Sequence, residues 1–204
     1  MKSPLSLLMP IILLSLLTGC EKEPERMDNY LVNFATVLKE ESGYRFRLDN
    51  NRTVIPKIMD DYKGSEGQRV ILNYTPLKGD TIHVRRISDI FTDVIQQNGF
   101  PERYVDDPVR IQSVWVAGDY LNMIIEIEYH SVPHVVSLFR DHLSDTVDLW
   151  FSHSRNNDPR GYQRTMYASF SLQSLRNGSN STAIPFRLFI HTPAGMREFQ
   201  FELK

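Results

Sequence analysis

Apolar and polar side chains alternate over residues 121–130 of this 204-residue chain, with an apolar or aromatic residue at every odd position and Ile124 as the even exception. Successive side chains of a β-strand point to opposite faces of its sheet, so this pattern predicts a strand with one buried and one hydrated face. Further strands are predicted at residues 111–116, 135–139, 147–151, 166–172, 184–190 and 199–203. Seven short strands separated by turn residues favour a β-sandwich over residues 108–204.

A second group of strand-like segments precedes the first. It comprises residues 30–38, 44–48, 53–58, 70–74 and 81–87. Three segments in a meander, an interruption and then two more is the order of a five-stranded OB barrel, which we assign to residues 29–90. The predicted fold class is therefore all-β, with an N-terminal five-stranded OB-type barrel followed by a C-terminal seven-stranded β-sandwich.

The segment between the two groups, residues 91–107, has a different character. Asp93 to Gly99 resembles a short helix that ends at a glycine, and Phe100 to Asp107 resembles an extended connection. We therefore predict a linker with a short helix at residues 91–107.

The only cysteine of the chain, Cys20, directly follows an apolar N-terminal stretch. Residues 1–19 have the parts of a secretory signal peptide, and their apolar core is too short to span a bilayer. Leu17-Thr18-Gly19-Cys20 resembles the bacterial lipobox, which implies acylation of Cys20 and cleavage before it. The alternative is an ordinary signal peptide with an incidental cysteine. Residues 20–28 are charged and predict a solvated tether.

This N-terminus predicts a protein anchored to the membrane through lipid on Cys20. Position 21 is Glu and not Asp, so the usual inner-membrane retention signal is missing, and the outer membrane is expected, on either its periplasmic or its exposed side. Once Cys20 is acylated, the chain has no thiol left for a disulfide or a nucleophile. A net charge of −2 and the exported address argue against a nucleic-acid partner.

The whole layout resembles the NigD-like lipoproteins of Bacteroidetes. The resemblance is carried by the lipobox and by residues 30–37, 67–74 and 110–115. It implies an N-terminal OB domain and a C-terminal β-sandwich. The family takes its name from a gene cluster linked to a bacteriocin, which implies an immunity role as one version of its function. These motifs are structural, so no functional residue beyond Cys20 is implied.

Two groups of side chains are candidates for chemistry. Glu126 and Glu128 share one face of the alternating strand, and paired carboxylates serve in glycosidases, although any exposed strand face also offers such a pair. His130, His134 and His142 have a spacing that would suit a metal on a helix, but Pro133 interrupts it, and surface or turn histidines are the simpler interpretation. No metal, cofactor or catalytic residue is therefore predicted.

A candidate ligand surface is formed by Trp150 and Tyr167, with Arg45 and Arg47 on the barrel. The two aromatic residues fall among polar neighbours on strand faces that are otherwise hydrated. Exposed aromatics provide contact area for sugars or proteins, whereas a second layer that covers the sheet would explain the same pattern. We therefore expect a non-enzymatic module that binds a protein or a glycan. A surface hydrolase of glycans or peptides and a structural or adhesin subunit are the alternatives.

Overall fold

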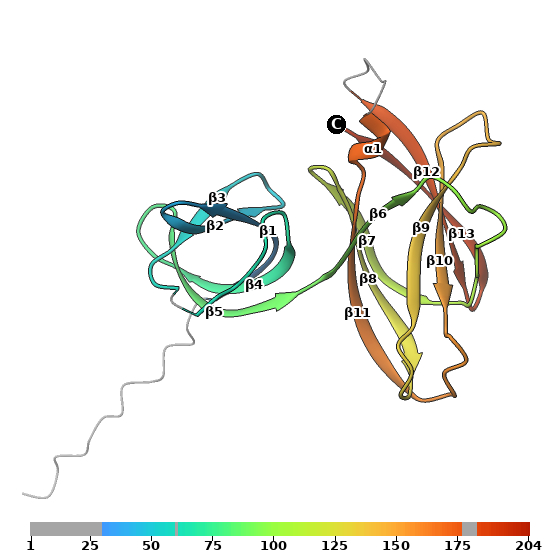
Figure 1. Cartoon of the computed structure of the whole chain (residues 1–204), viewed down its shortest axis with the longest axis horizontal. Coiled ribbons are helices and arrows are strands. Elements are labelled where there is room, and N and C mark those ends of the chain that lie inside the picture. The colour runs from blue at the N-terminus through green and yellow to red at the C-terminus, as the bar shows by residue number, and fades with distance from the viewer. Residues whose placement is uncertain (1–29, 60, 177–182) are drawn as a thin grey trace, which may run out of the picture.

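The computed structural model describes residues 30–59, 61–176 and 183–204. Its first five strands are β1 (Leu31–Glu40), β2 (Gly43–Leu48), β3 (Thr53–Pro56), β4 (Arg69–Pro76) and β5 (Thr81–Asp89). They form a closed barrel in the order β1-β2-β3-β5-β4 (Figure 1). The barrel closes through Ala35 of β1, which is in register with Leu48 of β2 and with Val70 of β4.

The core of the barrel follows the alternation of its strands. Phe46 and Leu48 of β2 are buried, while Arg47 between them is exposed. The same side of the other strands supplies the rest of the core, namely Ala35, Val37, Val54, Val70, Leu72, Tyr74 and Ile82. Burial of these side chains is the main driving force for closing the barrel.

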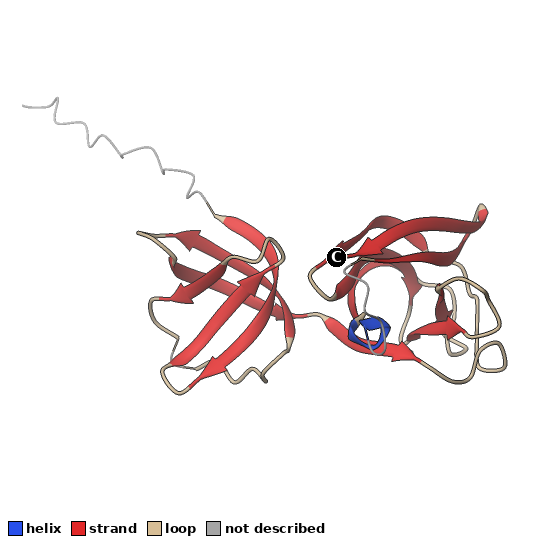
Figure 2. Ribbon diagram, turned by 90° about the horizontal axis from the view of Figure 1, so that it is seen from above, coloured by secondary structure: helices blue, strands red, loops and turns tan. Residues whose placement is uncertain are grey.

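Eight further strands build the C-terminal domain (Figure 2). They are β6 (Phe91–Gln96), β7 (Arg110–Ala117), β8 (Tyr120–Tyr129), β9 (Val135–Asp141), β10 (Asp148–Ser154), β11 (Tyr162–Ser171), β12 (Ile184–Thr192) and β13 (Gly195–Leu203). Their order is β13-β12-β10-β9-β6-β11-β8-β7. The odd residues of β8 that were predicted to be apolar and inward-facing lie in the core, with Leu121, Met123 and Ile125 fully buried.

The helix predicted at residues 93–99 is wrong. Residues 91–96 form strand β6, in which Ile95 is buried while Val94 is 54% exposed. β6 runs parallel to both β11 and β9 and joins them within one sheet. Both partners are distant in sequence, so the local pattern could not indicate the pairing. The C-terminal domain therefore has eight strands instead of the seven predicted, and β6 is the additional one. Within the described residues, α1 (Gln173–Arg176) is the only helix.

The N-terminal features lie outside the described residues, which begin at Tyr30. The lipobox, Cys20 and the tether therefore remain predictions. Within the part of the chain that is described, no helix has both the length and the apolar character needed to cross a membrane.

A buried arginine joins the two domains. Arg69, the first residue of β4, is 1% exposed. Its guanidinium donates to Asp49 of the barrel at 2.6 Å and to Asn122 of β8 at 2.9 Å. The Trp115 indole N–H donates to the second carboxylate oxygen of Asp49 at 3.2 Å. The barrel therefore contacts the β7-β8-β11 sheet at Trp115 and Asn122.

Candidate functional site

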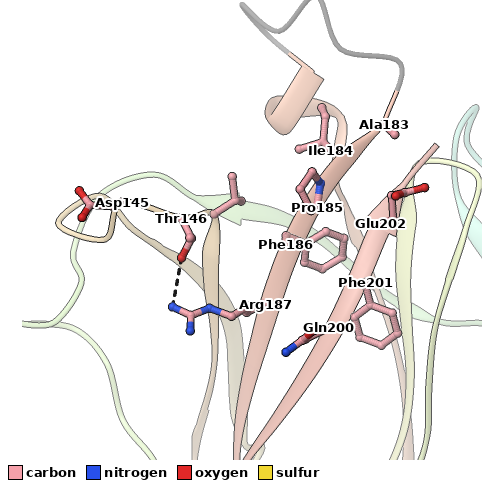
Figure 3. Close-up of a pocket in the computed structure, with 11 residues that line it drawn as sticks. Asp145, Thr146, Ala183, Ile184, Pro185, Phe186, Arg187, Gln200, Phe201 and Glu202 are labelled. Carbon is pink, nitrogen blue, oxygen red and sulfur yellow. Dashed lines mark hydrogen bonds between the residues drawn. The ribbon is translucent and has the colours of Figure 1, made fainter.

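A cleft with a volume of about 760 Å³ lies at one end of the C-terminal sheet. Figure 3 shows the side chains that line it, from the β9–β10 loop, the start of β12 and the end of β13. We call it the β12–β13 cleft; it is lined by Asp145, Thr146, Val147, Ala183, Ile184, Pro185, Phe186, Arg187, Gln200, Phe201 and Glu202.

Two phenylalanines give the β12–β13 cleft its aromatic part. Phe186 and Phe201 are in register on neighbouring strands, and their ring centroids are 5.6 Å apart. Phe186 is buried, whereas Phe201 is only partly buried and stacks on Phe199 at 6.3 Å. A partner placed against Phe201 would therefore gain apolar contact that the domain itself leaves incomplete.

The loop beside the cleft is held by a network around Asp148. Ser144 and Thr146 each donate to the Asp148 carboxylate at 2.8 Å, and Arg187 donates to it at 2.6 Å and 2.8 Å. The hydrogen bond from Arg187 is the main reason that the pKa of Asp148 lies below its ordinary value. The ion pair likewise raises the pKa of Arg187. The charge of Arg187 is therefore balanced within the protein.

This ordered loop presents Leu143 to solvent. The Leu143 side chain is 89% exposed, the highest exposure among the large apolar residues of the described chain. Its backbone N–H donates to Asp141 at 2.8 Å, so the loop is fixed on that side as well. Leu143 is therefore exposed on the same loop that supplies Asp145, Thr146 and Val147 to the lining of the cleft.

Trp150, predicted as part of a ligand surface, lies within an aromatic stack. Its ring centroid is 4.4 Å from that of Phe189 and 5.3 Å from that of Phe100, and both rings stack on it, at interplanar angles of 16° and 28°. The Tyr104 ring centroid is 5.8 Å away. Phe100 and Tyr104 belong to the segment between β6 and β7. The covering layer that was weighed as an alternative is therefore present over Trp150.

The other three residues of the predicted surface lie elsewhere. Tyr167 is 38% exposed and its ring is 6.1 Å from Phe34 of the barrel. Arg45 forms an exposed ion pair with Glu40 at 3.0 Å, and Arg47 lines a small crevice of about 110 Å³ between the two domains. No contact joins Trp150 to these three residues in the described chain, and whether any of the four binds a ligand stays a prediction.

The predicted carboxylate pair does share one pocket. Glu126 and Glu128 line a pocket of about 270 Å³ together with Arg110, Arg155 and Arg160. The Glu126 carboxylate accepts a hydrogen bond from Gln112 at 2.7 Å, and Glu128 is 4.0 Å from Arg155. We call this the Glu126–Glu128 pocket.

The predicted histidine group is not brought together. His130 contacts Ser131, whereas His134 Nδ1 is 2.8 Å from Nε2 of His153, a residue that sequence spacing did not suggest. His134 Nε2 faces Asp158 at 3.3 Å, and His153 Nδ1 faces the Asp107 carbonyl oxygen at 3.0 Å. In the described residues, no three His, Cys, Asp or Glu side chains are arranged to hold a metal ion.

Burial and hydrogen bonds shift the pKa of two groups at this histidine pair. Burial lowers the pKa of His153, against the opposing effect of its bond to the Asp107 carbonyl oxygen. Burial would raise the pKa of Asp158, but the N–H groups of residues 130–132 and the bond from His134 outweigh it and hold that pKa below its ordinary range.

A closed OB barrel followed by a β-sandwich defines the class of this two-domain, all-β protein. Family models match both parts, the NigD-like N-terminal OB domain over residues 34–90 and the NigD-like C-terminal beta sandwich domain over residues 92–203. The chain belongs to the NigD-like family, which confirms the resemblance and the fold class predicted from sequence. No curated protein matches it.

Solved structures with the same fold come from Parabacteroides and Bacteroides species. A candidate toxin-related protein of Parabacteroides distasonis has a TM-score of 0.78 and 25% identity, over 85% of this chain and 93% of that one. A NigD-like immunity protein of Bacteroides caccae has a TM-score of 0.65 and 21% identity, over 84% and 96%. A candidate lipoprotein of Bacteroides fragilis has a TM-score of 0.62 and 10% identity, over 86% and 98%.

Proposed function

We propose that this chain is a lipid-anchored protein of the outer membrane that binds another protein without catalysing a reaction, and that the β12–β13 cleft and Leu143 form its binding surface. The observation that carries the proposal is the exposure of Leu143 on a hydrogen-bonded loop whose later residues, Asp145 to Val147, line the β12–β13 cleft. Interfaces gain most of their affinity from a few large side chains that fill such clefts.

The charges around the β12–β13 cleft indicate the chemistry of the partner. Arg187 is balanced by Asp148, so the rim carboxylates Asp145 and Glu202 leave the cleft acidic. Lys204 is 3.8 Å from Glu202 but is itself 83% exposed, so this ion pair is weak. We therefore propose a partner segment with an apolar side chain for the cleft and Lys or Arg beside it.

A photo-crosslinking residue at position 143 tests this surface in intact cells. The crosslinked partner is identified by mass spectrometry and then purified, and its affinity is measured for the wild type and for Leu143→Asp. We expect Leu143→Asp to weaken binding at least tenfold, or about 1.4 kcal/mol. The matched control is Met196→Asp, because Met196 is 45% exposed on β13 but does not line the cleft. Equal losses in both variants would exclude this surface.

The anchor is tested separately. The Cys20→Ser variant should move from the membrane fraction to the soluble envelope fraction, because it lacks the thiol that carries the lipid. Recovery of the variant in the membrane would refute lipid anchoring, and protease treatment of intact cells would distinguish the periplasmic from the exposed side.

Immunity to a secreted antibacterial protein is one specific version of this function. Its support is the family membership together with a related fold that is described as a NigD-like immunity protein. Cells that lack the gene should become sensitive to the toxin encoded beside it, and restoring the gene should protect them. Unchanged sensitivity would exclude this version while leaving protein binding to be tested by the crosslinking experiment.

A surface hydrolase is the second candidate, because Glu126 and Glu128 line one pocket. Turnover of a polysaccharide or of peptidoglycan that disappears in Glu126→Gln or Glu128→Gln would favour it over the binding protein.

A further inference from the structure

The Glu126–Glu128 pocket is lined by residues of the C-terminal domain alone, with none from the barrel. Arg110 is in register with Glu126, and Gln163 is in register with Glu128, so these four side chains share the outer face of the sheet. Asn122 and Trp115, which contact the barrel, lie on the same face farther along the strands. The pocket is therefore separate from both the domain junction and the β12–β13 cleft.

The arginines of this pocket have hydrogen-bonding capacity to spare. The guanidinium groups of Arg110 and Arg160 make no hydrogen bond and no ion pair within the described residues. Arg155 donates through Nη2 to the Asp158 carbonyl oxygen at 3.2 Å, yet its Nε is buried without any partner. The free donors of Arg110 and Arg160 are therefore available to an acceptor on a ligand.

The pocket also offers acceptors. The Glu128 carboxylate is 4.0 Å from Arg155, too far for a hydrogen bond, so its oxygens can accept from a ligand. Glu126 has a partner on one oxygen only, which is Gln112. Three guanidinium groups and two carboxylates leave one excess positive charge in a volume of about 270 Å³, just below the range of about 300–1,000 Å³ for small-ligand pockets.

We propose that this pocket binds a uronic acid unit of an acidic polysaccharide. The sugar carboxylate would be held by the arginines, whose planar donors match its geometry. The ring hydroxyls would donate to Glu126 and Glu128. An acidic peptide would bring further carboxylates toward those two residues and would be repelled, whereas one sugar ring brings a single carboxylate and several hydroxyl donors. A neutral sugar would leave the arginines without an anionic partner.

The probe for this site is hexagalacturonate, titrated calorimetrically into the protein purified in detergent from cells that express the full-length chain. We expect saturable binding that weakens about tenfold for the fully methyl-esterified hexamer, which keeps the sugar but loses the charge. The Arg110→Gln/Arg160→Gln double variant should lose affinity by about tenfold or more. Arg86→Gln, which removes an exposed arginine of β5, is the matched control and should bind as the wild type does.

A lysine variant distinguishes the effect of the planar guanidinium geometry from the effect of positive charge. Arg110→Lys/Arg160→Lys keeps both charges but not the planar fork, so it should bind more weakly than the wild type and more tightly than the glutamine variant. Glu126→Gln should also bind more weakly, because an amide accepts hydroxyl protons less strongly than a carboxylate. All variants should melt at the wild-type temperature, since Arg110 and Arg160 are exposed.

Four of the five results that would overturn the proposal come from binding measurements. They are no binding of hexagalacturonate, equal binding of its methyl ester, equal binding of hexaglutamate, and wild-type affinity in the double glutamine variant. Cleavage of the hexamer would also overturn it as stated, because the pocket would then be a hydrolase site. None of these results depends on Leu143 or the β12–β13 cleft, so the outcome is independent of the proposed protein-binding function.

Discussion

Arg69 of the barrel and Asn122 of the sandwich are joined across the two domains by a hydrogen bond of 2.9 Å from Nη2 to Oδ1. The same guanidinium also bonds to Thr36 at 3.1 Å and lies 4.6 Å from the Tyr120 ring centroid. Asn122 in turn accepts from Ser169 at 2.6 Å. Each domain therefore supplies partners that the other domain needs, and the two are expected to unfold together.

Replacing Arg69 should destabilise both domains. We expect Arg69→Gln to lower the free energy of unfolding by about 3 kcal/mol, because Asp49 then loses its cation in a largely buried place. Urea unfolding followed by circular dichroism measures the change. Arg52→Gln is the control, because the Arg52–Asp80 pair is also on the barrel but is at least half exposed, and its loss should cost less than about 1 kcal/mol. Similar losses in both variants would contradict a special role for Arg69.

Acidification should destabilise the C-terminal domain through His153. Burial lowers the pKa of His153, against the opposing effect of its bond to the Asp107 carbonyl; His134 and Arg155 lower it further. The unfolded state therefore binds a proton at His153 more readily than the folded state does, and stability that is complete above pH 6.5 is lost as the pH falls. The slope should reach at most about 1.4 kcal/mol per pH unit.

Melting temperatures between pH 8 and pH 5 measure this effect. His153→Gln should flatten the pH dependence, while His83→Gln, which changes an exposed histidine of β5, should leave it as in the wild type. Asp158, with its lowered pKa, titrates below this window and does not interfere. An unaltered slope in His153→Gln would show that the pair does not control acid stability.

Gly161 should not tolerate a side chain. A Cβ atom there would lie 2.0 Å from the carbonyl oxygen of Tyr129, which belongs to the end of β8 and cannot move away freely. We expect Gly161→Ala to cost about 3 kcal/mol in urea unfolding. Gly118→Ala is the comparison. Gly118 has a φ of +54°, but no atom lies within 4 Å of the added Cβ, so this variant should lose only about 1 kcal/mol. A larger loss of stability in Gly118→Ala than in Gly161→Ala would contradict the close approach of Gly161 to Tyr129.

The contribution of Trp150 to stability should come from its aromatic ring and not from its indole N–H. Trp150→Ala should lower the free energy of unfolding by about 3 kcal/mol, because it removes a ring that stacks on both Phe100 and Phe189. Trp150→Phe should cost about 1 kcal/mol, since the buried indole N–H has no partner to lose. Chemical denaturation of both variants tests this, and equal losses would contradict it.

The sequence was sufficient where structure follows from local periodicity. The alternation in β8 predicted which face is buried, because every second side chain of a strand points to the same side. The turn residues between the apolar segments indicated where one strand ends and the next begins. The pairing of Glu126 and Glu128 on one face followed from the same rule and is present in the structure.

Only the tertiary structure determined the rest, because it depends on residues far apart in the chain. β6 is a strand because β9 and β11 supply its hydrogen bonds, and the His134–His153 pair and the Arg69 network join segments whose spacing carries no local signal. The β12–β13 cleft likewise forms only where a loop after β9 meets two strands near the C-terminus. Periodicity specifies which side chains are buried in each strand, whereas long-range pairing decides which of them meet.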